Sequence, residues 1–140
     1  MSAKVMAAGG TIRRARFVNL KTTANHTVEE ADANDRTIGV SQEGGREPAL
    51  PSVTADPPEA AQSGDQLRVY VPGDTCLLEI GSGGCTAGDD LKSDADGKGV
   101  TRATTGTTIQ NVGAIALETA SEGERAKVLV VYAHVRPALV

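Results

Sequence analysis

The longest apolar run of the chain lies near its C-terminus and indicates a central β-strand. Arg125 to Ala133 includes four consecutive bulky aliphatic residues, Val128 to Val131, which suit a pleated sheet and show no helical period. A strand that is apolar on both faces belongs in the middle of a sandwich or barrel. With the preceding stretch from Ile109, it forms a predicted hairpin that turns at Ser-Glu-Gly-Glu, residues 121–124, and that we expect at the core of the fold.

The same pattern of residues occurs earlier in the chain. Ser63 to Val71 aligns with Glu122 to Val130, and both read Gly, acid, polar, apolar, base, Val, large apolar, Val. A weaker copy is Ala87 to Lys92. The recurrence favours repeated strand-turn-strand modules, although the unequal spacing excludes a regular solenoid. Gly-acid turns before strands are also common in β proteins generally, so the alternative that the two segments are not a repeat stays open.

The other predicted strands are short and separated by turn signals. They are Thr37 to Val40, Gln66 to Val71, Thr75 to Ile80, Cys85 to Lys92 and Gly99 to Ala103. The Asp-Gly pair within Asp94 to Lys98 is a strong hairpin signal. No segment carries a convincing amphipathic helix. The sequence therefore predicts an all-β fold, a small β-sandwich or barrel of short antiparallel strands with long loops.

The length of 140 residues fits one domain. We expect its N-terminal segment and one long loop to lie outside the regular β structure. Residues 1–16 begin with a small, Ala-rich stretch that ends in Gly-Gly, and we expect a flexible, extended N-terminal arm. Residues 17–140 would then form a single β domain. Within it, residues 41–61 are rich in Pro and Gly and predict a long loop, a usual place for partner contacts.

The basic cluster near the N-terminus has two interpretations. Arg13, Arg14 and Arg16 lie among the apolar residues Ile12 and Phe17. As part of an arm, this segment would dock on an acidic surface. As a first strand, it would carry solvated arginines on one face, which is the commoner situation for a charge cluster.

The composition argues against several classes of function. The net charge is −4 and the pI about 5.1, whereas a protein that wraps nucleic acid is usually basic. One Phe, two Tyr and no Trp require an aliphatic core. The same scarcity leaves few rings for a small-molecule pocket, which aromatic side chains usually line.

The sequence also bears on the compartment in which the protein is made. No segment approaches the roughly 20 apolar residues of a membrane helix, and the N-terminus does not read as a signal peptide. We therefore expect a soluble protein synthesised in the cytoplasm, without a membrane partner. In that compartment Cys76 and Cys85 are expected to be buried free thiols rather than a disulfide.

A search for chemistry along the chain yields no convincing set. Asp94 to Gly97 resembles the start of a calcium loop, but no Glu follows at the required position. The Cys and His residues are too scattered to anchor a metal site. We therefore expect no enzyme activity, no catalytic residues, no metal and no cofactor. A small β domain of this kind would act through its surface, often as an oligomer that covers strand edges.

Several stretches resemble the capsid decoration (cement) proteins of tailed phages. They are Arg68 to Glu79, Thr86 to Val100 and Gly113 to Glu118, with Ile38 to Gly44 fitting as well. The resemblance covers roughly the last two thirds of the chain and consists of turns and strands. It implies a non-enzymatic virion protein that binds the outer surface of an icosahedral capsid, often as a trimer, and stabilises the shell.

On that resemblance, the expected partners are the major capsid protein and two further copies of the chain, with no nucleic acid. The expected contact residues are Ile12, Arg13, Arg14, Arg16 and Phe17, through strand addition to a capsid edge. A virion-surface module that binds a glycan or receptor is the alternative. It would need a groove with stacking side chains, for which only Phe17, Tyr70 and Tyr132 are available.

Overall fold

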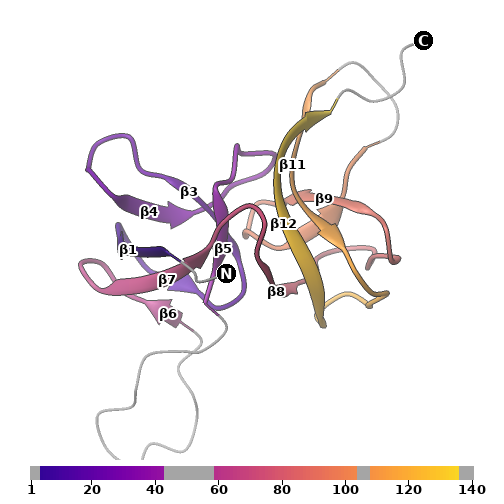
Figure 1. The fold of residues 1–140 in the computed structure, drawn as a ribbon, viewed down its shortest axis with the longest axis horizontal. Helices are drawn as coiled ribbons and strands as arrows, with labels where there is room; N and C mark the ends of the chain where they lie inside the picture. The colour runs from indigo at the N-terminus through magenta and orange to yellow at the C-terminus, as the bar shows by residue number, and fades with distance from the viewer. Residues whose placement is uncertain (1–3, 43–58, 104–107, 136–140) are drawn as a thin grey trace, which may run out of the picture.

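The computed structural model describes residues 4–42, 59–103 and 108–135, and this part of the chain is all β. The predicted fold class is confirmed (Figure 1). The strands are β1 (Lys4–Ala8), β2 (Ile12–Arg13), β3 (Phe17–Leu20), β4 (Thr27–Glu30), β5 (Gly39–Ser41), β6 (Glu59–Ala61), β7 (Gln66–Tyr70), β8 (Thr75–Glu79), β9 (Asp90–Ser93), β10 (Gly99–Thr101), β11 (Gln110–Ala116) and β12 (Arg125–Val135).

The first half of the chain closes into a small barrel. Its strand order is β1-β4-β3-β5-β7, with every pair antiparallel except β1 and β4, which run parallel. Side chains alternate across each strand, so Leu67 and Val69 of β7 point into the barrel while Arg68 points to solvent. The barrel core also contains Val18 and Val28. The short strands β2 and β6 form a separate pair beside the barrel.

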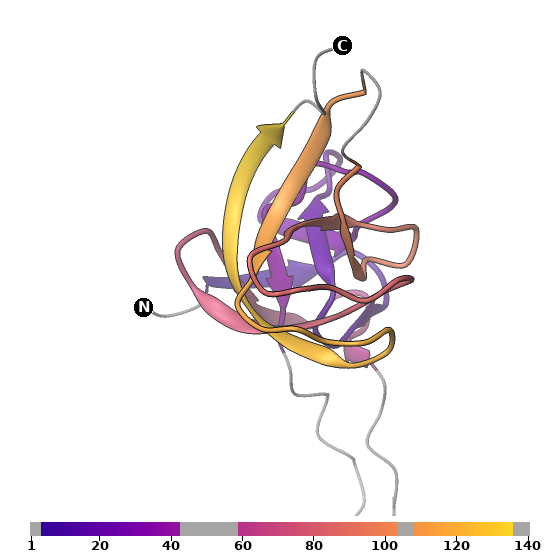
Figure 2. The same cartoon turned by 90° about the vertical axis from the view of Figure 1, so that its right-hand side faces the viewer.

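The second half of the chain forms a five-stranded antiparallel sheet in the order β10-β9-β11-β12-β8. The predicted C-terminal hairpin is confirmed as β11 and β12, which occupy interior positions of this sheet. Figure 2 shows both strands bending together, in orange and yellow. A single bridge between Ile80 and Gly99 connects the two ends of the sheet, so its concave face encloses a second core.

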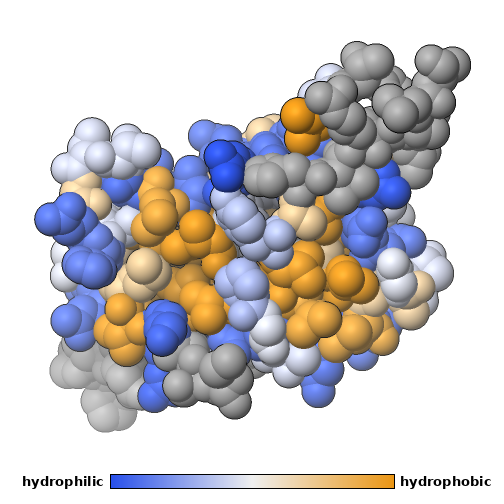
Figure 3. Space-filling view, turned by 45° about the horizontal axis from the view of Figure 1, so that its top comes forward, coloured by the Kyte–Doolittle hydropathy of each residue, from blue (hydrophilic) through white to orange (hydrophobic). Residues whose placement is uncertain are grey.

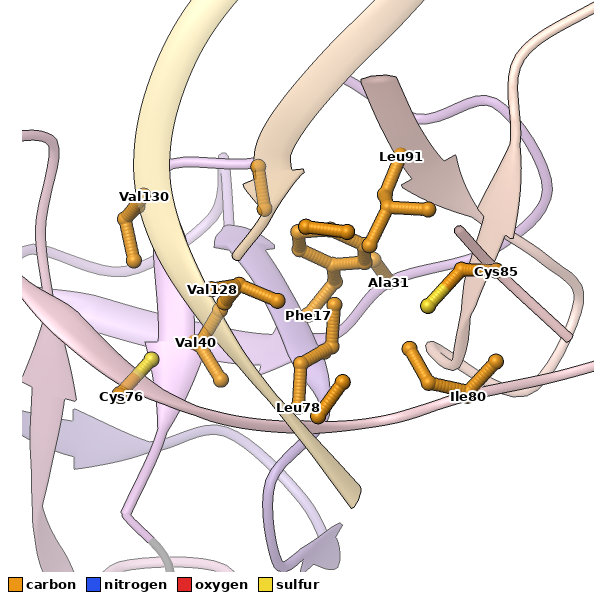
Figure 4. Packing of buried hydrophobic residues seen from close by; sticks show 13 residues of the cluster. Phe17, Ala31, Val40, Cys76, Leu78, Ile80, Cys85, Leu91, Val128 and Val130 are labelled. Carbon is orange, nitrogen blue, oxygen red and sulfur yellow. The ribbon is translucent and has the colours of Figure 1, made fainter. Parts of the chain in front are cut away.

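Strand β3 supplies side chains to both cores. Successive residues of a strand face opposite ways, so Val18 points into the barrel and Phe17 points out of it toward the sheet. Figure 4 shows the Phe17 ring among side chains of the five-stranded sheet. The close approach depends on Gly113 of β11, because a Cβ atom there would lie 2.7 Å from Phe17 Cε1 and 2.3 Å from Thr37 Oγ1. Phe17 therefore joins the two halves of the molecule.

The repeat detected in the sequence corresponds to a recurring turn. In each copy a glycine with positive φ precedes an acidic residue whose carboxylate accepts a hydrogen bond from the backbone N–H three residues earlier. The carbonyl of that earlier residue accepts the N–H of the acid, which completes a β-turn. In the three copies these turns end at Asp65, Asp89 and Glu124, and the same turn also occurs outside the repeat, at Asp74. The repeat is therefore a turn module, used in both halves of the chain.

The predicted flexible arm is wrong for the residues that the structure describes. Strand β1 pairs with β4 on one side and β7 on the other, and Ile12 is fully buried. Residues 4–16 are therefore part of the folded body, and a domain boundary after residue 16 would cut the turn between β2 and β3. The sequence gives little sign of this, because β1 is short and Ala8 is the one buried residue among its five. Residues 1–3 lie outside the described part.

Three smaller expectations need correction. The apolar run of β12 is not buried on both faces, because Leu129 and Val131 are only half-buried while Val128 and Val130 are fully buried. The strand expected from Cys85 begins only at Asp90. The loop expected at residues 41–61 is bounded by strands β5 and β6, and residues 43–58 lie outside the described part.

Candidate interaction surfaces

The first of the predicted contact arginines is held within the protein. Arg13 Nη2 lies 2.5 Å from Glu30 Oε1, and the Arg13 backbone N–H donates to the same carboxylate. Asp96, in the turn between β9 and β10, is a second partner at 3.6 Å. The hydrogen bond to Glu30 is the main reason that the pKa of Arg13 is raised above its usual value. This arginine joins the barrel to the five-stranded sheet.

Arg16 makes a similar connection at a more buried position. Its side chain is 8% exposed, and Nη2 donates to Glu79 Oε2 on β8 at 3.1 Å. Nη1 donates to the carbonyl of Asp96 at 2.9 Å. Lys98 lies 3.7 Å from the same Glu79 carboxylate, so the anion has two cationic neighbours. The pair stabilises the junction between the two halves of the protein.

The predicted contact residues therefore face the interior far more than was expected. Ile12 and Phe17 are fully buried, and Arg13 and Arg16 have partners within the chain. A buried atom of Arg14, Nε, also lies inside the fold. Strand β3 has no free edge for strand addition, because it pairs with both β4 and β5, and β2 pairs with β6 along one of its edges. Their contact with a capsid stays a prediction that this placement does not support.

We expect Arg16→Gln to lower the free energy of unfolding by about 1–3 kcal/mol, because it removes charged hydrogen bonds at a site with little water. Chemical denaturation followed by circular dichroism measures the change. Arg125→Gln is the matched control, since Arg125 is exposed on β12 and should change stability by less than about 0.5 kcal/mol. Equal effects of the two substitutions would contradict a structural role for Arg16.

The strand register places several half-buried apolar side chains together on the convex face of the five-stranded sheet. Ile115 lies opposite Leu129, Leu77 lies opposite Lys127, and all three apolar side chains are half-buried. Leu117, just after β11, is 46% exposed. We call these residues with Val131 the outer sheet face. Apolar surface also gathers in two groups on the side of the molecule drawn in Figure 3, with a more polar band between them.

The cysteines lie in the core of the second half. Cys76 and Cys85 are both buried free thiols, as predicted. Burial is the main cause that raises the pKa of the Cys85 thiol above its usual value. Within the residues that the structure places, no three His, Cys, Asp or Glu side chains form a group that could hold a metal ion.

We expect Cys85 to react slowly with Ellman's reagent at neutral pH in the folded protein, because the thiolate is the reacting species and burial disfavours it. Labelling of the Cys76→Ser variant isolates this thiol, and the same variant in denaturant gives the reference rate. The folded protein should react at least tenfold more slowly. Equal rates with and without denaturant would show that the thiol is accessible.

Comparison with known proteins finds a solved structure with a similar fold. No family model matches the chain, and no curated protein matches it either. The structure is similar to the crystal structure of the head fiber gp8.5 N base in bacteriophage phi29, with a TM-score of 0.60. Its fold resembles that of a phage head-fiber base. The likeness covers 91% of this chain and 92% of the other, at 17% sequence identity. It therefore extends over both halves, the barrel as well as the sheet.

In the described ranges, no helix has the length and apolar character that crossing a membrane requires.

Proposed function

We propose that the protein is a structural component of a tailed-phage virion that binds the outer surface of the capsid and stabilises it. The observation that carries the proposal is the likeness to the head-fiber base over nearly the whole length of both chains. The resemblance of the strand-and-turn segments to capsid decoration proteins supports the same class of function. The major capsid protein is then the partner.

Each copy of the protein needs only a weak contact with the capsid for such a role. A weak contact that is repeated over a whole shell adds up through multivalency, so a small interface is enough. The outer sheet face offers apolar side chains with Lys127 among them, on a rigid sheet. We propose that this face is covered in the assembly, either by the capsid or by a neighbouring copy in a homotrimer. Catalysis has no part in this role.

The test is co-sedimentation of the purified protein with empty shells of the phage that encodes it. The wild-type protein should pellet with shells and raise the temperature at which they fall apart. Leu117→Glu, in the outer sheet face, should weaken pelleting at least tenfold. Val5→Glu is the matched control, because Val5 is 63% exposed on the barrel, away from that face. Failure of the wild-type protein to pellet at any concentration would overturn the proposal.

The proposed homotrimer is tested separately, by the mass of the protein in solution. Light scattering on the eluting protein should give about 43 kDa, three times the chain mass of 14.4 kDa. A mass of one chain at micromolar concentration would rule out a preformed trimer, while leaving attachment of single copies to the shell as the remaining form of the proposal.

A further inference from the structure

A groove of about 530 Å³ opens where the end of β3 and the loop before β5 meet the end of β12. Its walls come from both halves of the protein and carry different chemistry. Leu20 and Tyr132 provide apolar surface, and they are 48% and 50% exposed. Thr22, Asp35 and Arg36 provide polar groups. We call this the Tyr132 groove.

The ring and the guanidinium in this groove form one recognition unit. Arg36 Cζ lies 5.6 Å from the centre of the Tyr132 ring, and Arg36 Nη2 donates a hydrogen bond to the Tyr132 hydroxyl. The hydroxyl is the sole hydrogen-bond partner of the Arg36 side chain among the residues that the structure describes. Arg36 is exposed and lines the groove, and a guanidinium is the side-chain group that pairs best with a carboxylate.

The opposite side of the groove offers acceptors. Asp35 Oδ2 accepts hydrogen bonds from the Asn19 side-chain amide at 3.3 Å and from the Asp32 backbone N–H at 2.9 Å. Within the described ranges, Asp35 Oδ1 has no partner, so one oxygen of a fixed carboxylate is available. Thr22 adds an exposed hydroxyl. Such groups bind the hydroxyls of a polar ligand.

The loop that carries Asp35 and Arg36 is fixed by its neighbour Asn34. The Asn34 side chain donates to the carbonyl of Ile109 and accepts the backbone N–H of Asn111 at 2.9 Å each. Its backbone carbonyl accepts from the Asn111 amide, and its N–H donates to the carbonyl of Ser93. These bonds fasten the loop to β9 and β11, so the groove is preformed and binding costs little ordering of the loop.

We propose that the Tyr132 groove binds a saccharide that carries a carboxylate, such as a uronic or sialic acid. The half-exposed Tyr132 side chain contacts the C–H face of a sugar ring, Arg36 pairs with the carboxylate, and Asp35 and Thr22 bind hydroxyls. A nucleic-acid strand fits less well, because it carries a phosphate at every nucleotide, which the net charge of −4 disfavours, whereas Arg36 can pair with a single carboxylate. The inference goes beyond capsid attachment and does not depend on it.

The test titrates the isotope-labelled full chain with two matched pairs of probes by NMR. The pairs are sialyllactose with lactose, and a hyaluronan tetrasaccharide with its carboxyl-reduced form. The acidic member of at least one pair should shift the amides of residues 19–22, 35–38 and 132 in a saturable way. Its neutral counterpart should bind at least tenfold more weakly. Raising the salt concentration should weaken the acidic probe alone.

Variants decide whether the groove is responsible. Arg36→Gln and Tyr132→Ala should each weaken the acidic probe at least tenfold, whereas Arg125→Gln, on the same strand as Tyr132, should leave its binding unchanged. Tyr132→Phe keeps the ring and separates stacking from the hydroxyl contact. Thermal melting shows that each variant is folded. No saturable shift with either acidic probe, or equal binding of acidic and neutral probes, would overturn the proposal.

Two further results would also decide against the site. If Arg36→Gln abolished shell binding while no saccharide bound, the groove would be a protein-docking site instead. If saccharide shifts appeared only outside the groove, the ligand would bind elsewhere. Failure of shell binding with saccharide binding intact would count against the proposed capsid role alone, so the two proposals can be separated.

Discussion

Deleting residues 1–16 is expected to abolish cooperative folding. The deletion removes β1, which pairs with both β4 and β7, and so opens the barrel into a sheet with two unpaired edges. It also removes Ile12, one of the largest fully buried side chains, and Arg16 with its bond to Glu79. Loss of a fully buried Ile alone costs about 2–5 kcal/mol, a large share of the stability of a small domain.

The measurement is the yield of soluble protein and its thermal unfolding curve. We expect aggregation, or a broad transition without the sharp unfolding of the full chain. Deleting residues 1–3 is the control, because it removes none of the described strand pairs and should leave the melting temperature within a few degrees of the full chain. A stable, cooperatively unfolding chain that begins at residue 17 would show that β1 and β2 are dispensable.

Deletion of the first residues cannot test the proposed attachment to a capsid. If the first residues formed a detachable arm, their removal would report on attachment alone. Because they close the barrel, the same deletion would lose shell binding merely by unfolding the protein. Exposed positions such as Leu117 and Val5 are therefore the informative ones, since substitution there leaves both cores intact.

Features of the fold that depend on residues close together in the sequence could be predicted. The hairpin of β11 and β12 could be predicted because its second strand is a continuous run of bulky aliphatic residues. The Gly-acid turns could be predicted because each needs only a glycine with positive φ and an acid beside it, as at Gly64 and Asp65. In both cases the determining interactions span a few residues of the chain.

The features that could not be predicted join residues far apart in sequence. Arg16 and Glu79 are 63 positions apart, and Arg36 and Tyr132 are 96 apart. The basic cluster was visible in the sequence, but its acidic partners come from other strands and carry no local signal. The parallel pairing of β1 with β4 is equally non-local, and a strand of five residues gives no pattern strong enough to reveal it.

The arginines at the junction between the barrel and the sheet have two different environments. Buried and half-buried arginines lie where the barrel meets the sheet, and their role is to hold the halves together. Arg36 and Tyr132 lie at the same junction but at its exposed end, where both line the groove. The rigid junction can therefore serve stability inside the molecule and recognition at its rim.

Substitution of Phe17 by alanine is expected to be the most damaging single change. Phe17 is the only phenylalanine, is fully buried, and reaches from the barrel into the core of the sheet. Truncation should lower the free energy of unfolding by about 3–5 kcal/mol, because it leaves a cavity at the junction. Urea denaturation measures the loss, and Val5→Ala at an exposed site should cost less than about 0.5 kcal/mol.

A double-mutant cycle with Gly113 tests the reason for this cost. Gly113→Ala alone should destabilise, because its Cβ atom would lie 2.7 Å from the Phe17 ring and even closer to Thr37 Oγ1. With Phe17→Ala already present, the new methyl group enters space that the ring has left, so the added cost should fall by about 1 kcal/mol or more. Strictly additive effects would mean that Phe17 and Gly113 do not share a packing constraint. The two halves of the protein would then be held together by the arginine contacts instead.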